Sequence, residues 1–173
     1  VVVMKRLSKA IADGDPIYAT IEATGINYDG KTNGITAPSG LAQTELLSSI
    51  YDQYHIDPAK LNYIVTHGTG TRLGDPVEIH ALNEAFKKQT KEKQYCALTS
   101  TKTNFGHTFA ASGLVSLISL VQALRHEMIP ASLNLQEQSD YVNWRNTAFY
   151  VNQFNKPWKK EPHQPRMGAV SAF

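Results

Sequence analysis

Cysteine is scarce in this sequence: Cys96 is the only one among 173 residues. A single thiol excludes an internal disulfide framework and any zinc or iron–sulfur site built from several cysteines, and it fits a reducing, cytoplasmic setting. An excess of one charge is also lacking, because 17 lysines and arginines are balanced by 15 aspartates and glutamates. Partners held by bulk charge are therefore disfavoured, and we expect binding neither to nucleic acid nor to an anionic membrane surface.

A hydrophobic run of membrane-spanning length is a third absence. The longest apolar stretch, residues 109–124, falls short of the ~18–20 residues that cross a bilayer, and serines, a glycine and a glutamine interrupt it. We predict a buried helix over 109–125, apolar on nearly every side and covered on both, and no membrane anchor. A signal peptide and an initiator methionine are missing too, so both ends are interpreted as interior segments of a longer chain.

The hydrophobic residues that are present, 42% of the total, suffice for one packed domain. Their periodicity predicts helices near 47–54, from 75 onward and over 109–125, and strands at 1–7, 17–23, 62–66, 95–98, 147–151 and 167–173. In the second helix, Asp75 is predicted as the N-cap, Pro76 as the first helical residue and Glu78 as an acid favoured by the helix dipole. Alternating strands and helices predict an α/β layered fold with a helix between sheets.

Two loops at predicted strand-to-helix junctions each contain a histidine. Residues 67–71 read His-Gly-Thr-Gly-Thr, and residues 102–107 read Lys-Thr-Asn-Phe-Gly-His within a loop predicted over 99–107. Loops beyond the carboxyl ends of strands are where α/β proteins place their chemistry. The glycines allow close approach of the backbone to a ligand, and the hydroxyls of Thr69 and Thr71 suit hydrogen bonds to an amide-bearing substrate. These two loops are the predicted site.

Three other interpretations of these loops are disfavoured. Gly68, Gly70 and Gly74 approach a dinucleotide fingerprint, but the spacing is one residue too long and no acid follows about 20 residues later. A phosphate-binding P-loop requires Gly-Lys-Ser/Thr, whereas Gly74 precedes Asp75. A zinc site would favour histidines at i, i+4 spacing, and no such pair exists. The remaining histidines are interpreted as structural or surface residues: His55, His80, His126 and His163.

The motifs around both loops resemble a known family. Residues 64–78 (IVTHGTGTRLGDPVE) and 101–107 (TKTNFGH) resemble the two histidine motifs of β-ketoacyl synthases, most closely the ketosynthase domains of modular polyketide synthases, and residues 33–38 and 124–130 are similar to that family as well. The resemblance implies the thiolase fold, with α-β-α-β-α layers in two related halves, usually in a homodimer. Residues 1–26 would then be the last strands of the first half, and 27–173 most of the second.

The resemblance also implies a role for each matching residue. His67 and His107 match the two catalytic histidines, Lys102 the lysine that organises them electrostatically, and Thr69 and Thr71 positions that contact a phosphopantetheine arm. The implied reaction is decarboxylative Claisen condensation of an enzyme-bound acyl thioester with malonyl-acyl carrier protein, with two imidazoles stabilising the enolate. The expected partners are the carrier protein and the missing first half of the ketosynthase. No metal and no directly bound cofactor are expected.

The sequence departs from the family pattern at two places. The nucleophilic cysteine has no counterpart, and Cys96, in the strand before the second motif, is interpreted as a buried structural thiol. Phe109 stands where many modular ketosynthases have a glutamate, two residues after His107. Two alternatives stay open: a non-elongating ketosynthase that only transfers acyl chains, which the intact His67 disfavours, and a fragment with a structural or docking role alone.

Overall fold

The computed structural model describes residues 1–34 and 36–173, so Ile35 of the 33–38 motif lies outside the described residues. Its helices are α1 (Leu7–Ala12), α2 (Gly40–Gln53), α3 (Gly74–Lys87), α4 (Lys102–Phe105) and α5 (Ser112–His126), with short 3-10 turns at Pro58–Lys60, Phe109–Ala111 and Trp144–Asn146. Its strands are β1 (Leu61–Val65), β2 (Cys96–Thr99), β3 (Met128–Ile129), β4 (Phe149–Val151), β5 (Lys156–Pro157) and β6 (Met167–Val170).

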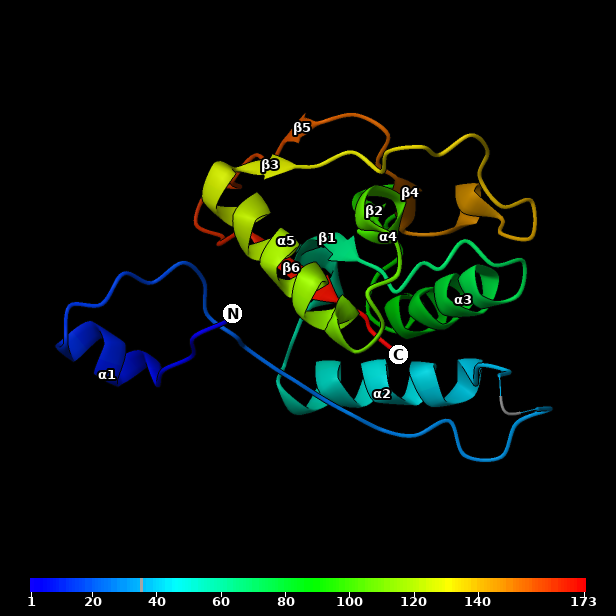
Figure 1. Cartoon of the computed structure of the whole chain (residues 1–173), viewed down its shortest axis with the longest axis horizontal. Helices are drawn as coiled ribbons and strands as arrows, with labels where there is room; N and C mark the ends of the chain where they lie inside the picture. Colours follow the sequence, from blue (N-terminus) through cyan, green and yellow to red (C-terminus); the bar gives the residue numbers. More distant parts are fainter. Residues whose placement is uncertain (35) are drawn as a thin grey trace.

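Four strands form a parallel sheet in the order β4-β2-β1-β6 (Figure 1). In its register, Ile64 of β1 lies opposite Leu98 of β2 on one side and Ala169 of β6 on the other. The remaining two strands, β3 and β5, form a small antiparallel ribbon. Because all four strands of the main sheet run the same way, the segments that follow β1, β2 and β6 emerge at one edge.

Helices cover both faces of the sheet. Figure 1 shows α2 and α3 side by side along one face and α5 across the other. Successive side chains of β1 point to opposite faces of the sheet. Ile64 packs in the cluster with α2 and α3, whereas Tyr63 and Val65 pack in the cluster with α5. Helix, sheet and helix thus form three layers, which confirms the predicted α/β layered class.

Helix α5 is covered on one side only in the described part of the chain. Its buried residues, Ser112, Ser116, Leu120 and Ala123, form one row, while Leu114 and Ile118 are exposed. The predicted coverage on both sides is therefore wrong for this chain, because no second sheet lies over the outer face among the described residues. The span Phe109–His126 meets the length and composition of a membrane helix, yet its buried row packs against β1 and β6 as in a soluble core.

The predicted strands at 1–7 and 17–23 are also wrong, since the structure has helix α1 at Leu7–Ala12 and no strand before β1 in the described residues. A strand needs a neighbour for its backbone hydrogen bonds, and this segment has none here. Figure 1 shows α1 apart from the layered body and the following segment passing along α2. There Asn27 donates to the Ala42 carbonyl at 2.7 Å, and Ile17, Tyr18 and Ile21 remain exposed.

Two local predictions need smaller corrections. Helix α3 begins at Gly74 rather than after Asp75, and the Asp75 carboxylate accepts from the Gly70 N–H at 3.1 Å instead of capping its own helix. The segment 99–107 contains one turn of helix, α4, where a loop was predicted. Strands β1, β2 and β4 lie within one or two residues of their predicted positions, β6 ends at Val170 rather than at residue 173, and the short strands β3 and β5 were not predicted.

Candidate active site

The two histidine loops meet at the carboxyl edge of the sheet. His67 follows β1, Lys102 begins α4 just after β2, and Phe173 follows β6. These three strands are neighbours, so residues more than 100 positions apart along the chain come into contact. The structure therefore brings together His67, His107 and Lys102, which the sequence predicted as one site.

The imidazole rings of His67 and His107 lie edge to face, with ring centroids 5.6 Å apart at an interplanar angle of 80°. Each ring receives a backbone hydrogen bond on Nδ1: the Phe173 N–H donates to His67 at 3.3 Å, and the Phe109 N–H donates to His107 at 3.0 Å. An Nδ1 atom that accepts a hydrogen bond leaves the proton of a neutral imidazole on Nε2. In the neutral form of each ring, the proton is thereby placed on Nε2.

Lys102 lies against His67. Its Nζ donates to the His67 carbonyl oxygen and lies 3.5 Å from His67 Nδ1. Burial, together with the nearby Lys102 cation and His107, lowers the pKa of His67 to about 4. Burial also lowers the pKa of Lys102, opposed by the carboxyl groups of Glu78 and Asp75. At neutral pH the imidazole of His67 is therefore uncharged, the state in which it donates from Nε2.

Glu78 is a site residue that the sequence reasoning missed. Its buried carboxylate accepts from the backbone N–H groups of His67 at 2.8 Å and Gly68 at 2.9 Å. Burial raises its pKa to about 7, although these two hydrogen bonds favour the charged form. A signal existed in the sequence, because Ala81 and Leu82 follow at i+3 and i+4 and place Glu78 on the buried face of α3.

A glycine lets the two loops touch. Gly68 has φ +42°, and a Cβ there would lie 2.8 Å from the Cβ of Ser100. The Ser100 hydroxyl donates to the Gly68 carbonyl at 2.8 Å and accepts from the Lys102 N–H at 3.3 Å. Any larger residue at 68 would separate the loops, so the glycine is required both by conformation and by space.

Thr69 and Thr71 lie on the outer part of the first loop. Their hydroxyls are 3.2 Å apart, and Thr71 Oγ1 accepts from the Gly74 N–H at 3.0 Å. Within the described residues, neither hydroxyl is hydrogen-bonded to the histidines or to Lys102. These threonines shape the loop, and Thr71 is exposed to solvent.

Cys96 belongs to the core. It lies in β2 with no exposed surface, in the cluster with Leu98 and Phe149, and burial raises the pKa of its thiol. A buried thiol whose deprotonation is disfavoured is a poor nucleophile. This placement agrees with the structural role predicted for Cys96.

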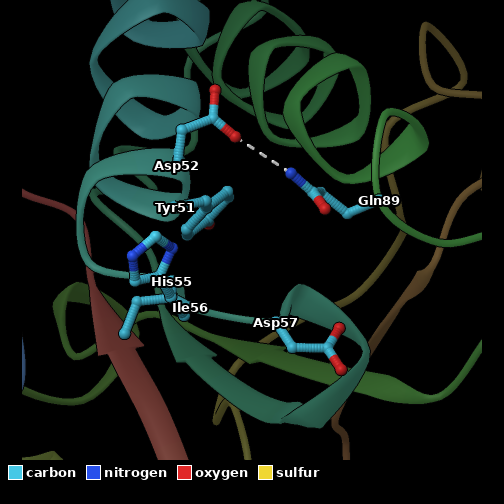
Figure 2. A pocket seen from close by; sticks show the side chains of 6 residues that line it. All are labelled: Tyr51, Asp52, His55, Ile56, Asp57 and Gln89. Carbon is cyan, nitrogen blue, oxygen red and sulfur yellow. Dashed lines mark hydrogen bonds between the residues drawn. The ribbon is translucent and has the colours of Figure 1, made fainter.

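A cavity and a groove in the described part of the chain lie outside the histidine site. The one in Figure 2, about 260 Å³, lies at the end of α2, where Asp52 accepts from the Gln89 side chain at 3.1 Å; its lining residues are Tyr51, Asp52, His55, Ile56, Asp57 and Gln89. The other, about 610 Å³, is a mostly apolar groove along the exposed side of α5. Neither contains a predicted site residue.

The family model for the β-ketoacyl synthase C-terminal domain matches residues 18–136, more than half of the chain. The chain belongs to this family. It is 52% identical over 173 residues to the polyketide synthase ThaG of Burkholderia thailandensis and 46% identical over 170 residues to the polyketide synthase PksM of Bacillus subtilis. It covers 3% and 4% of the length of these relatives.

A solved ketosynthase has the same fold. The ketosynthase from module 6 of the bacillaene synthase of Bacillus subtilis matches 94% of this chain with a TM-score of 0.92 and 42% identity, and this chain covers 29% of that structure. The chain is therefore a ketosynthase portion of the thiolase-like fold class, as the motifs predicted, and its relatives are modular polyketide synthases.

Proposed function

We propose that the intact ketosynthase of which this chain is the C-terminal portion joins an enzyme-bound acyl group to malonyl-acyl carrier protein by decarboxylative Claisen condensation. The observation that supports this is the pair of imidazoles 5.6 Å apart, each with Nδ1 occupied by a backbone N–H. Two neutral Nε2–H donors suit a reaction that develops negative charge on one oxygen, because preorganised donors stabilise that charge as it forms.

In this proposal the bond between the malonyl carboxylate and its α-carbon breaks, and carbon dioxide leaves. The electron pair stays as an enolate whose oxygen accepts hydrogen bonds from His67 and His107. The enolate carbon then attacks the acyl thioester carbonyl, and the thiolate that carried the acyl group departs. Burial, helped by the positive charge of Lys102, keeps His67 neutral, and Glu78 accepts hydrogen bonds from the backbone N–H groups of residues 67 and 68. The thiolate belongs to a part of the ketosynthase outside this chain.

The substrate would arrive on the phosphopantetheine arm of an acyl carrier protein, with Thr69 and Thr71 as its contacts. We further propose a cytoplasmic homodimer that needs no metal and no cofactor of its own. Carbon dioxide release from malonyl-carrier protein by the acylated, intact ketosynthase tests the reaction. If the wild-type enzyme accepts acyl groups and releases no carbon dioxide, the transfer-only alternative replaces the proposal.

The isolated 173-residue chain is expected to form no acyl-enzyme, because its one thiol is buried and resists deprotonation. Intact-protein mass spectrometry after incubation with an acyl thioester measures this. The intact ketosynthase is the positive control, and Cys96→Ala in that enzyme should leave its acylation unchanged. A saturable adduct on Cys96 of the isolated chain would contradict the structural role of this thiol.

Lys102→Met in the intact ketosynthase is expected to raise the pKa of His67 from about 4. Methionine keeps much of the side-chain volume and removes the positive charge that disfavours protonation of the imidazole. A neutral donor would then be lost at a higher pH, so the acidic limb of the decarboxylation profile should move upward. The control is Lys88→Met at the exposed end of α3. An unmoved acidic limb would show that Lys102 does not act through its charge.

A further inference from the structure

Phe109 has an unusual backbone conformation. Its φ is +49°, in the left-handed region, where a bulky side chain is a rare and strained occurrence. Its ring is 80% exposed, so burial within the described chain does not compensate for the strain. Strain of this kind persists where the surrounding structure uses the conformation, and it concentrates at functional sites. The neighbours of Phe109 therefore indicate what the conformation serves.

Phe109 makes two contacts with the same side chain, the imidazole of His107. The Phe109 N–H donates to His107 Nδ1 at 3.0 Å, and the Phe109 ring is stacked on the imidazole at 5.1 Å between centroids and 26° between planes. The left-handed turn brings both groups to the same imidazole. In the described residues this is the only hydrogen bond of the His107 ring.

His67 is held more firmly than His107. It is buried, it lies beside Lys102, and it also has a phenylalanine ring, that of Phe173, at 4.5 Å. His107 is exposed and depends on Phe109 for its orientation. Removal of the Phe109 ring would leave the His107 imidazole free to turn about the single remaining hydrogen bond, away from its edge-to-face position beside His67.

We propose that Phe109 is a positioning residue, whose stacked ring fixes the plane of the His107 imidazole for the decarboxylation step. This inference rests on the proposed function. A neutral ring orients the imidazole without adding negative charge.

The test uses the intact ketosynthase and measures two steps separately: acyl-enzyme formation by mass, and carbon dioxide release from malonyl-carrier protein in a single turnover. Phe109→Leu removes the aromatic ring, and Phe109→Asn removes it while accommodating the left-handed backbone. Both variants should slow carbon dioxide release about tenfold, because the loss of one aromatic pair changes a rate by at most about that factor. The rate of acylation should stay within about twofold of the wild-type rate. Phe109→Tyr, which keeps the ring, should restore the wild-type rate.

The matched control is Phe154→Leu, which removes another exposed ring from outside both histidine loops. Its carbon dioxide release should equal that of the wild type. The assignment of Phe109 is overturned if Phe109→Leu and Phe109→Asn decarboxylate normally, or if they slow acylation as much as decarboxylation. His107→Ala separates the two proposals: normal decarboxylation by that variant rejects the proposed function itself, whereas a slow His107→Ala with a normal Phe109→Leu rejects only the role of Phe109.

Discussion

In the intact ketosynthase, His67→Ala and His107→Ala are each expected to slow carbon dioxide release by ~10²–10³-fold while the acyl-enzyme still forms. Removal of one preorganised donor to a developing oxyanion has an effect of about this size. The negative charge of the enolate appears only when carbon dioxide leaves, so the loss should fall on that step. Attack of the thiolate on the incoming acyl group does not need both imidazoles.

A single-turnover experiment separates the two steps by following the acyl-enzyme by mass and carbon dioxide independently. The matched control is His80→Ala, because His80 is exposed on α3 and lies outside the site. If His67→Ala condenses at the wild-type rate, this ketosynthase uses donors other than His67. If acylation falls as far as decarboxylation, the histidines serve the fold of the site or the first step, and the proposed division of roles is wrong.

The sequence predicted which residues form the site because parallel strands have a simple geometric consequence. His67 and Lys102 each follow a strand that the apolar pattern identifies, and strands in one parallel sheet end at one edge. The distance between the two imidazoles then depends on the loops that carry them. No periodicity describes those loops, which contain Gly68 at φ +42° and Gly106 at φ +76°.

The residues that support the histidines escaped prediction for a different reason. Glu78 was interpreted only as an acid favoured by the helix dipole, whereas its carboxylate is buried and accepts hydrogen bonds from two backbone N–H groups of another loop. Phe173 donates to His67 across 106 positions of sequence. Such contacts depend on the order of the strands in the sheet. Sequence patterns that are analysed one segment at a time do not predict that order.

In the N-terminal segment, the alternation of apolar and polar residues predicted a strand that the structure does not form. Residues 17–23 alternate apolar and polar side chains as a strand does, yet they form no strand here, and Tyr18 instead lies under the guanidinium of Arg125 at 4.3 Å. Alternation describes which side chains suit a sheet, while a strand also requires a partner for its backbone. The same reasoning applies to α5, whose apolar outer side suits a covering layer that the described residues do not supply.

Leu120→Asp is expected to prevent folding of the intact ketosynthase. Leu120 is 6% exposed and packs between α5 and the sheet, with Tyr63, Val65, Ala97, Ala123, Ile129 and Trp158. Its side chain fills the space above Gly168 of β6, where a Cβ would lie 2.6 Å from Leu120 Cδ1. An unpaired carboxylate in this position costs several kcal/mol, and the whole stability of a domain is only about 5–15 kcal/mol.

Soluble yield and the midpoint of thermal unfolding measure the effect. His80→Asp, at an exposed position of α3, is the control and should unfold within a few degrees of the wild type. Leu120→Ala should fall between the two, because it leaves a cavity without burying a charge and costs roughly 2–5 kcal/mol. A soluble Leu120→Asp enzyme with an unchanged midpoint would mean that α5 does not pack on β1 and β6 in the intact domain. The carboxyl edge that carries His67 and Phe173 would then lack the support described here, because those residues follow the two strands on which α5 lies.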